Sequence, residues 1–168
     1  MRSFKILPVL ISLLWSGGPA AADEGPFLQS LAGTWSGKGT VIMKIGRQPI
    51  NVSCSLSSTA QAASVVMKGT CRGLLVVTRR ISAELNAGSA GYSGIYIGPS
   101  GGQSALSGTR RGNAIDLSVR WGKDVNGDRT ARMMIQLVGA DGLRLRTIDK
   151  DLSTGKEVAT CDIVLQRN

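Results

Sequence analysis

The sequence predicts an all-β fold, with about eight to ten antiparallel strands in a single domain. Apolar and polar residues alternate through most of the chain, which is the pattern of strands with one buried face. Turn signals rich in Gly, Pro, Asn and Asp recur at short intervals, and no stretch has the spacing of an amphipathic helix. A barrel and a sandwich of two sheets share this pattern, so both stay open at this point.

The N-terminal residues 1–22 have the three parts of a secretory signal peptide. Arg2 and Lys5 form a basic start, residues 6–15 are apolar, and Ala20-Ala21-Ala22 supplies an A-x-A cleavage site between Ala22 and Asp23. The apolar run is shorter than the ~20 residues that a membrane-spanning helix needs. We therefore expect a periplasmic or secreted protein that has no transmembrane span.

Residues 33–45 carry the most specific pattern of the domain, which we place at residues 33–168. From Trp35 to Ile45 every second residue is apolar or glycine, and Gly37 and Gly39 directly follow the aromatic residue. Glycine inside a strand marks a bend, a bulge or the close approach of another backbone. These glycines favour a first strand that bends to wrap a barrel and to make room for Trp35. Residues 23–32 are expected to form a short lead-in turn or helix.

Alternating segments separated by turns fill the rest of the domain. The Asn126-Gly127 dipeptide predicts a tight hairpin, and a second hairpin is expected near Ala62 and Ala63. The predicted strands lie within residues 50–56, 65–71, a long β-rich run 73–85, 92–97, 105–110, 114–121, 131–137, 143–148 and 159–165.

The three cysteines allow at most one intramolecular disulfide, and export would place them where disulfides persist. A hairpin centred near Ala62 and Ala63 puts Cys54 and Cys71 directly opposite each other, within the separation that a disulfide accepts. Cys161 belongs to the last strand, which in a closed barrel pairs with the first strand, so we expect it to be the free thiol. The alternative is a bond that uses Cys161.

Charge gives a weaker indication of partners. The net charge is +9, and removal of Arg2 and Lys5 with the signal would leave +7. A basic exported domain favours anionic envelope components such as lipopolysaccharide, acidic phospholipid or acidic polysaccharide, although the charge could serve solubility alone. Nucleic acid is not expected as a partner of an exported chain. The anion-binding candidates, if they converge on one face, are Arg79, Arg80, Arg110, Arg111, Arg144 and Arg146.

Enzymatic chemistry finds little support in the sequence. The chain has no histidine, so it has no Ser-His or Cys-His couple. Its carboxylates are expected mostly in turns, and the runs Asp124–Asp128 and Asp149–Asp151 lack the glycine and glutamate positions of a calcium loop. Asp116 could bind a cationic group if its face lines a lumen. We expect no enzyme activity, no metal and no cofactor.

One motif carries a resemblance to a known superfamily. Gly33-Thr34-Trp35, with a short apolar turn before it and meandering strands after it, resembles the G-x-W motif that opens lipocalins and other calycins. The resemblance implies an up-and-down barrel in which Trp35 plugs one end and Arg167 packs over it. Residues 30–37, with the paired cysteines downstream, are similar to small exported lipocalin-like proteins of alphaproteobacteria. Haem-binding calycins ligate iron through histidine. This chain has no histidine, so the resemblance does not imply haem binding.

Two functions fit these expectations. The first is a periplasmic lipocalin-like protein that binds a small, lipidic or anionic ligand in the mouth of its barrel. The second is an envelope-associated interaction or inhibitor protein that acts through its basic surface and loops, with no ligand pocket. Abundant Gly, Ala and Ser leave room inside a barrel, whereas the aromatic residues are few.

Overall fold

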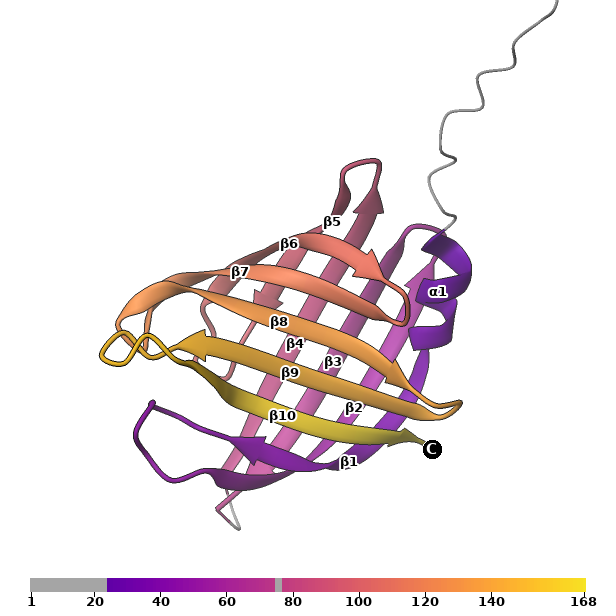
Figure 1. The fold of residues 1–168 in the computed structure, drawn as a ribbon. Coiled ribbons are helices and arrows are strands. Elements are labelled where there is room, and N and C mark those ends of the chain that lie inside the picture. The colour runs from indigo at the N-terminus through magenta and orange to yellow at the C-terminus, as the bar shows by residue number, and fades with distance from the viewer. Residues whose placement is uncertain (1–23, 75–76) are drawn as a thin grey trace, which may run out of the picture.

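The computed structural model describes residues 24–74 and 77–168, so the predicted signal peptide and its cleavage site at Ala22 and Asp23 lie outside the described residues. The described chain forms one helix followed by ten strands (Figure 1). Their bounds are α1 Glu24–Leu31, β1 Gly33–Val41, β2 Ile50–Gln61, β3 Ser64–Gly73, β4 Val77–Gly88, β5 Gly91–Ile97, β6 Gln103–Arg111, β7 Ala114–Val125, β8 Asp128–Val138, β9 Gly142–Lys150 and β10 Glu157–Arg167. Within these residues, no helix has the length and apolar character needed to cross a membrane.

The ten strands form a closed antiparallel barrel in which each strand pairs with its neighbours in sequence. Pairing between β1 and β10 closes the barrel and places Trp35 opposite Arg167 and Val41 opposite Cys161. The predicted all-β, up-and-down architecture is therefore confirmed, and the open choice between barrel and sandwich is decided in favour of the barrel. The hairpin expected at Asn126-Gly127 joins β7 to β8, with both residues at positive φ.

The glycines of β1 allow β10 to cross it closely. A Cβ atom on Gly37 would lie 2.0 Å from the Val164 carbonyl oxygen, and one on Gly39 would lie 2.1 Å from that of Asp162. Only glycine fits such contacts with backbone atoms. Strand β1 ends at Val41, however, and not at Ile45 as the alternation suggested. The chain turns there, and the Ile45 amide instead donates to Asn126 Oδ1 at 2.9 Å, across the end of the barrel.

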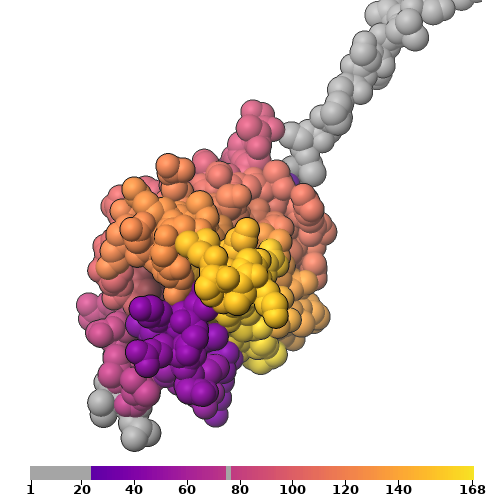
Figure 2. Space-filling model, turned by 60° about the vertical axis from the view of Figure 1, so that its left-hand side comes forward, coloured from indigo at the N-terminus to yellow at the C-terminus, as the bar shows by residue number. Residues whose placement is uncertain are grey.

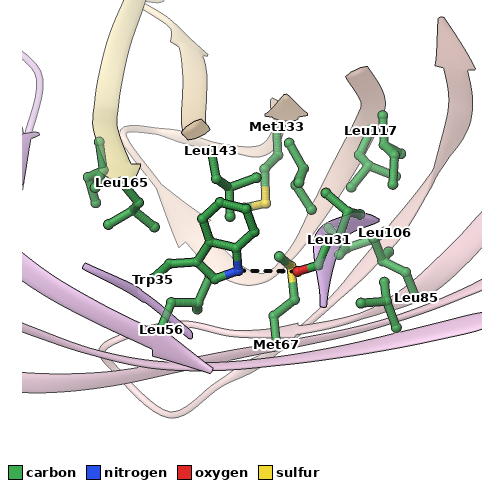
Figure 3. Close-up of a cluster of buried hydrophobic side chains, with 14 of the residues drawn as sticks. Leu31, Trp35, Leu56, Met67, Leu85, Leu106, Leu117, Met133, Leu143 and Leu165 are labelled. Atoms are coloured by element: carbon green, nitrogen blue, oxygen red, sulfur yellow. Dashed lines mark hydrogen bonds between the residues drawn. The ribbon is translucent and has the colours of Figure 1, made fainter. Parts of the chain in front are cut away.

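The opposite end of the barrel is closed by α1 and an apolar core. Leu28 and Leu31, three residues apart on one face of the helix, are completely buried, as is Trp35. Figure 3 shows Leu31 and Trp35 among apolar side chains that come from strands all around the barrel. Because these side chains fill the interior at this end, open space inside the barrel is left toward the other end.

One predicted element has different bounds. The β-rich run 73–85 corresponds mainly to β4, which begins only at Val77, whereas Gly73 is the last residue of β3. Leu74 has a φ of 48°, a left-handed conformation that is uncommon for a residue other than glycine. The segment is apolar and has no turn residue after Gly73, so alternation and composition gave no signal of this hairpin.

Candidate functional site

A cavity of about 1190 Å³ occupies the open end of the barrel. Its mouth is framed by the five connections at this end: β1–β2, β3–β4, β5–β6, β7–β8 and β9–β10. Figure 2 brings this end forward and shows the indigo β1–β2 segment beside the yellow β9–β10 segment. Met43, Leu74 and Leu152 expose most of their apolar side chains here, at 67%, 63% and 53%. The mouth therefore presents apolar groups to an incoming ligand.

One wall of the cavity, formed by β1 to β4, is apolar. Val41, Ile50, Val52 and Ile81 line it together with Cys71. Cys71 lies opposite Cys54 in the β2–β3 register, and the two form a disulfide, as predicted. Because both sulfurs are committed to this bond, the wall offers a ligand mainly hydrocarbon and sulfur contacts.

The other wall contains a buried carboxyl group. Asp149, near the end of β9, is only 4% exposed, and its Oδ2 atom accepts a hydrogen bond from the Thr160 hydroxyl of β10. Burial raises the pKa of Asp149, while the Thr160 hydroxyl and the nearby Trp121 indole N–H oppose this rise and the Asp128 charge adds to it. The carboxyl therefore accepts a proton more readily than an exposed aspartate does.

Two irregularities in the strand ladders build this polar wall. On β10, Ala159 pairs with Ile148 and Cys161 pairs with Thr147, which leaves Thr160 as the extra residue of a bulge. Bulges redirect side chains, and this one orients the Thr160 hydroxyl so that it donates a hydrogen bond to Asp149.

On β7 the pairing with β8 is interrupted between Arg120 and Val125. In this region the guanidinium group of Arg129 replaces part of the missing backbone pairing. It donates hydrogen bonds to the carbonyl oxygens of Trp121 at 3.0 Å and Gly122 at 3.1 Å. Trp121 is thereby held at the cavity wall by a side chain of the neighbouring strand.

Two aromatic side chains complete the polar wall. Tyr96 of β5 meets Trp121 of β7 edge to face, with ring centroids 6.2 Å apart. Both line the cavity, whereas Phe27, Trp35 and Tyr92 do not. Burial raises the pKa of the Tyr96 hydroxyl, and that of the Cys161 thiol to about 12, with the charge of Asp162 adding to the latter. Cys161 is the free cysteine and also lines the cavity.

Asp149 Oδ1 and Trp121 Nε1 are both fully buried within this wall. The Trp121 indole N–H acts on the Asp149 carboxyl group and lowers its pKa against the effect of burial, so the two side chains interact with each other.

The sequence reasoning did not identify Asp149 as a site residue, because it placed this carboxylate in a turn. The signal was present in the alternation of β9, where Leu143, Leu145, Thr147 and Asp149 follow one another on the inward face. Asp116, which was left open as a lumen residue, lies on the outer surface 3.8 Å from Arg132.

The six candidate arginines do not converge on one face. Arg79 and Arg80 lie on β4, five strands away from Arg144 and Arg146 on β9, and only Arg79 lines the cavity mouth. Arg80 borders a separate hollow of about 560 Å³ on the outside of β1 to β4. Three of the other arginines are engaged in ion pairs.

These pairs use Glu24 and Asp162. Arg110 contacts Glu24 at 2.7 Å, and Arg144 and Arg146 contact Asp162 at 2.6 and 3.6 Å. For Arg79, Arg80 and Arg111 no ion pair is found within the described part of the chain. The arginines therefore form no single anion-binding surface.

Trp35 and Arg167 meet at the closed end, far from the cavity mouth. The guanidinium carbon of Arg167 lies 4.0 Å from the centroid of the Trp35 ring. Arg167 also donates to the carbonyl oxygens of Ala32 at 2.5 Å and Ser30 at 2.8 Å, and Trp35 Nε1 donates to that of Leu31 at 3.2 Å. This arrangement fastens the end of α1 to the first and last strands.

Comparison with known proteins supports the fold and no more. The sequence matches no family model and no curated protein. The crystal structure of Rv2717c from M. tuberculosis is similar, with a TM-score of 0.63 and 15% identity over 85% of this chain and 98% of that chain. The S-type phycobiliprotein lyase CPES from Guillardia theta has a TM-score of 0.44 and 14% identity over 85% and 91%. The chain is a closed ten-stranded antiparallel barrel, and its fold is similar to that of Rv2717c.

Among the residues described by the structure, no group of three or more His, Cys, Asp or Glu side chains is placed to hold a metal ion.

Proposed function

We propose that this protein is an exported, lipocalin-like binding protein that takes a small, largely apolar ligand into the open end of its barrel. The observation that carries the proposal is the cavity of about 1190 Å³, which combines one apolar wall, one wall with a few buried polar groups, and a rim where exposed apolar side chains lie among charged ones such as Lys44, Lys123 and Asp124. Pockets for small molecules have this composition, in which apolar surface supplies affinity and a few polar atoms fix orientation. The calycin-like fold is consistent with it.

The proposal is one of binding and not of catalysis. Asp149 is the buried carboxyl group of the cavity, and its partner is a threonine hydroxyl, an arrangement that orients the carboxyl without activating a nucleophile. The alternative, an envelope-associated protein that acts through its basic surface, gains less support, since Arg110, Arg144 and Arg146 are engaged in ion pairs.

A fluorescence titration tests ligand binding. N-phenylnaphthylamine is an apolar dye that becomes fluorescent in a dry pocket, and we expect it to bind the protein with one site. Ile50→Trp fills the apolar wall near the mouth and should weaken dye binding about tenfold or more. Asn51→Trp, the next residue on β2 with an exposed side chain, is the matched control and should leave binding unchanged. Absence of dye binding by the natural protein, or equal binding by both variants, would refute the proposal.

Export and ligand identity can be examined in one preparation. The sequence of residues 1–22 leads us to expect a periplasmic protein whose N-terminus reads Asp23-Glu24-Gly25. N-terminal sequencing of the periplasmic fraction checks this, and recovery of the full-length chain from the cytoplasm would contradict it. Native mass spectrometry of the same material would reveal the mass of a ligand that co-purifies.

A further inference from the structure

The positive charge of the protein is concentrated in one part of the barrel wall. Residues 25–83 contain seven Lys and Arg and no Asp or Glu, whereas residues 84–168 contain eleven Lys and Arg and nine Asp and Glu. The first of these stretches forms β1, β2, β3 and the first half of β4, which are neighbours in the barrel. A surface of one sign attracts partners of the opposite sign. This sector of the wall is therefore suited to an anionic partner.

Exposed apolar side chains lie at the mouth end of the same sector (Figure 2). Met43 in the β1–β2 connection and Leu74 between β3 and β4 are 67% and 63% exposed, the two highest values for large apolar side chains in the described chain. The two connections are neighbours, because β2 pairs with β3 and a Cβ atom on Gly73 would lie 3.2 Å from Ile50 Cγ2. A partner that covers these side chains gains the free energy of removing them from water.

The tip of the β1–β2 connection is held in its exposed position by hydrogen bonds. The Ile42 amide donates to the Thr160 carbonyl oxygen at 2.7 Å, and the Ile45 amide donates to Asn126 Oδ1 at 2.9 Å. Met43 lies between these two anchored residues and points to solvent. Its exposure is therefore built into the fold of the connection.

Four basic side chains accompany the two apolar ones. Lys44 and Arg47 are exposed in the β1–β2 connection, and Arg72 and Arg79 are exposed near the β3–β4 connection. Within the residues that the structure describes, none of the four forms an ion pair. Their charges are therefore available to a partner. We call these four residues, with Met43 and Leu74, the docking patch.

The acidic residues at the surface of the mouth belong to other connections. Asp124 lies at the end of β7, directly after Lys123. Asp151 lies in the β9–β10 connection, where its carboxylate accepts hydrogen bonds from the hydroxyls of Ser153 at 2.7 Å and Thr154 at 2.8 Å. A surface that approaches the docking patch therefore meets basic groups and no carboxylate of the same connections.

The combination of charge and apolar exposure selects among three possible partners. A soluble polyanion would pair with the basic groups but leave Met43 and Leu74 in water. A second copy of the chain would cover the apolar groups but bring the basic groups of two molecules together. A bilayer with anionic lipid satisfies both, because its head groups attract Lys and Arg and its acyl boundary accepts apolar side chains.

We propose that the docking patch binds the surface of an anionic phospholipid bilayer, with Met43 and Leu74 inserted at the acyl boundary and the four basic side chains at the head groups. This inference goes beyond the proposed function, since it concerns the surface beside the mouth and needs no ligand inside the barrel. Where both hold, an apolar ligand enters the cavity from the bilayer without crossing bulk water.

Sedimentation with lipid vesicles tests the apolar part of the patch. We expect the mature protein to bind vesicles of phosphatidylcholine and phosphatidylglycerol in equal amounts about tenfold more tightly than phosphatidylcholine alone, and added salt should weaken this binding. Met43→Asn with Leu74→Asn should weaken it about tenfold or more. Ile95→Asn with Val138→Asn is the matched control, because these side chains are 46% and 44% exposed outside the patch, and it should keep the binding.

A second pair of variants tests the charges. Lys44→Gln with Arg47→Gln should weaken binding to the anionic vesicles about tenfold or more, because each basic group near the bilayer contributes to the attraction. Arg111→Gln with Arg120→Gln removes the same charge from exposed positions on β6 and β7 and should keep most of the binding.

A fluorescence measurement locates the contact. Met43→Trp introduces an indole at the exposed tip, and its emission should shift to shorter wavelength when anionic vesicles are added, because the ring leaves water. Ile95→Trp, on the outer face of β5, should show no such shift. Equal shifts for the two variants would contradict docking through this patch.

The remaining outcomes separate docking from ligand binding and from other partners. Full vesicle binding by Met43→Asn with Leu74→Asn would show that charge alone attracts the protein, and would overturn the proposal. A natural protein that is dimeric in analytical ultracentrifugation, and that the same variant makes monomeric, would assign the apolar groups to a second copy and also overturn it. Binding of N-phenylnaphthylamine without vesicle binding would overturn docking and leave the proposed function intact. Vesicle binding without dye binding would do the reverse.

Discussion

Asp149 should make the stability of the protein depend on pH in the sense opposite to that of a salt-bridged carboxylate. Burial raises its pKa in the folded state, so the fold favours the protonated form. Its contribution to stability is then fully present below the pKa of the unfolded chain, near pH 4, and is lost as the pH rises through the folded-state pKa. Asp149→Asn cannot ionise, and its free energy of unfolding relative to the natural protein should therefore increase between pH 4 and pH 7.

Asp162→Asn is the control of opposite sign. The hydrogen bond and charge of Arg144 lower the pKa of Asp162 against the effect of its burial. Asp162 therefore stabilises the fold at pH values above the pKa of the unfolded chain. This stabilisation is lost as the pH falls through the lowered pKa of the folded state. Denaturant titrations at several pH values measure both effects. A difference between Asp149→Asn and the natural protein that does not change with pH would contradict the prediction.

Gly39 is predicted to tolerate no side chain. The Cβ atom of Gly39→Ala would overlap the backbone of β10, with the Asp162 carbonyl oxygen at 2.1 Å and the Ile163 Cα atom at 2.5 Å. The strands would have to separate, and we expect a loss of about 3 kcal/mol in the free energy of unfolding. Gly102→Ala is the matched control, because no atom lies within 4 Å of its added Cβ and its φ is not positive. Chemical denaturation compares the two, and equal stabilities would show that β1 and β10 pack more loosely than described.

At the scale of elements, α1 has only eight residues and depends on the barrel for its stability. Glu24 anchors its start by accepting hydrogen bonds from Arg110 at 2.7 Å and from the Tyr92 hydroxyl at 2.5 Å. Burial raises the pKa of Glu24, but these hydrogen bonds and the Arg110 charge outweigh it, and the net pKa is lowered. The anchor is therefore complete at neutral pH and weakens as the pH falls through this lowered pKa.

Glu24→Gln should remove about 1–2 kcal/mol of stability at pH 7, the scale of hydrogen bonds to a charged group, and much less at a pH below the pKa of Glu24. Hydrogen exchange should show faster exchange of the α1 amides in this variant. Glu84→Gln, at an exposed carboxylate of β4, should change neither quantity. If α1 were equally protected in both variants, the contacts of Glu24 would add nothing to those made by Leu28, Leu31 and Arg167.

The strands were predictable because their pattern is local. Alternation located most of them, and the turn at Ala62 and Ala63 fixed the register that joins Cys54 to Cys71. The polar wall was not predictable in this way. It depends on the bulge at Thr160 and on the interrupted β7–β8 ladder at Trp121, where strict alternation fails. It also requires the curvature of the sheet, which brings Tyr96 of β5 against Trp121 of β7 and near Cys161 of β10.

For the molecule as a whole, the disulfide should contribute substantially to stability. Cys54 and Cys71 are 17 residues apart in sequence, and constraint of such a loop in the unfolded chain corresponds to about 3 kcal/mol. The double substitution Cys54→Ala and Cys71→Ala should lower the free energy of unfolding by this amount, whereas Cys161→Ala leaves the bond in place.

Peptide mapping without reduction checks the assignment of the cysteines. The native protein should yield the Cys54–Cys71 linked peptide. Cys161 should react with iodoacetamide far more slowly in the folded than in the unfolded protein, because burial raises the pKa of its thiol to about 12 and little thiolate is present. Rapid labelling of Cys161 in the folded protein, or a linked peptide that contains it, would contradict the described arrangement.

The pairing of β1 with β10 has a consequence for how the chain reaches its native state. The contacts between Trp35 and Arg167 join residues from opposite ends of the domain, so they contribute to a high contact order, which is associated with slow folding. During synthesis β1 is complete long before β10 exists, and until then its outer edge can pair with another chain. Interactions within the nascent chain can form the meander from β1 to β9, but they cannot remove that edge. The step most exposed to aggregation is therefore the last one, in which the final strand arrives and the sheet loses both of its edges at once.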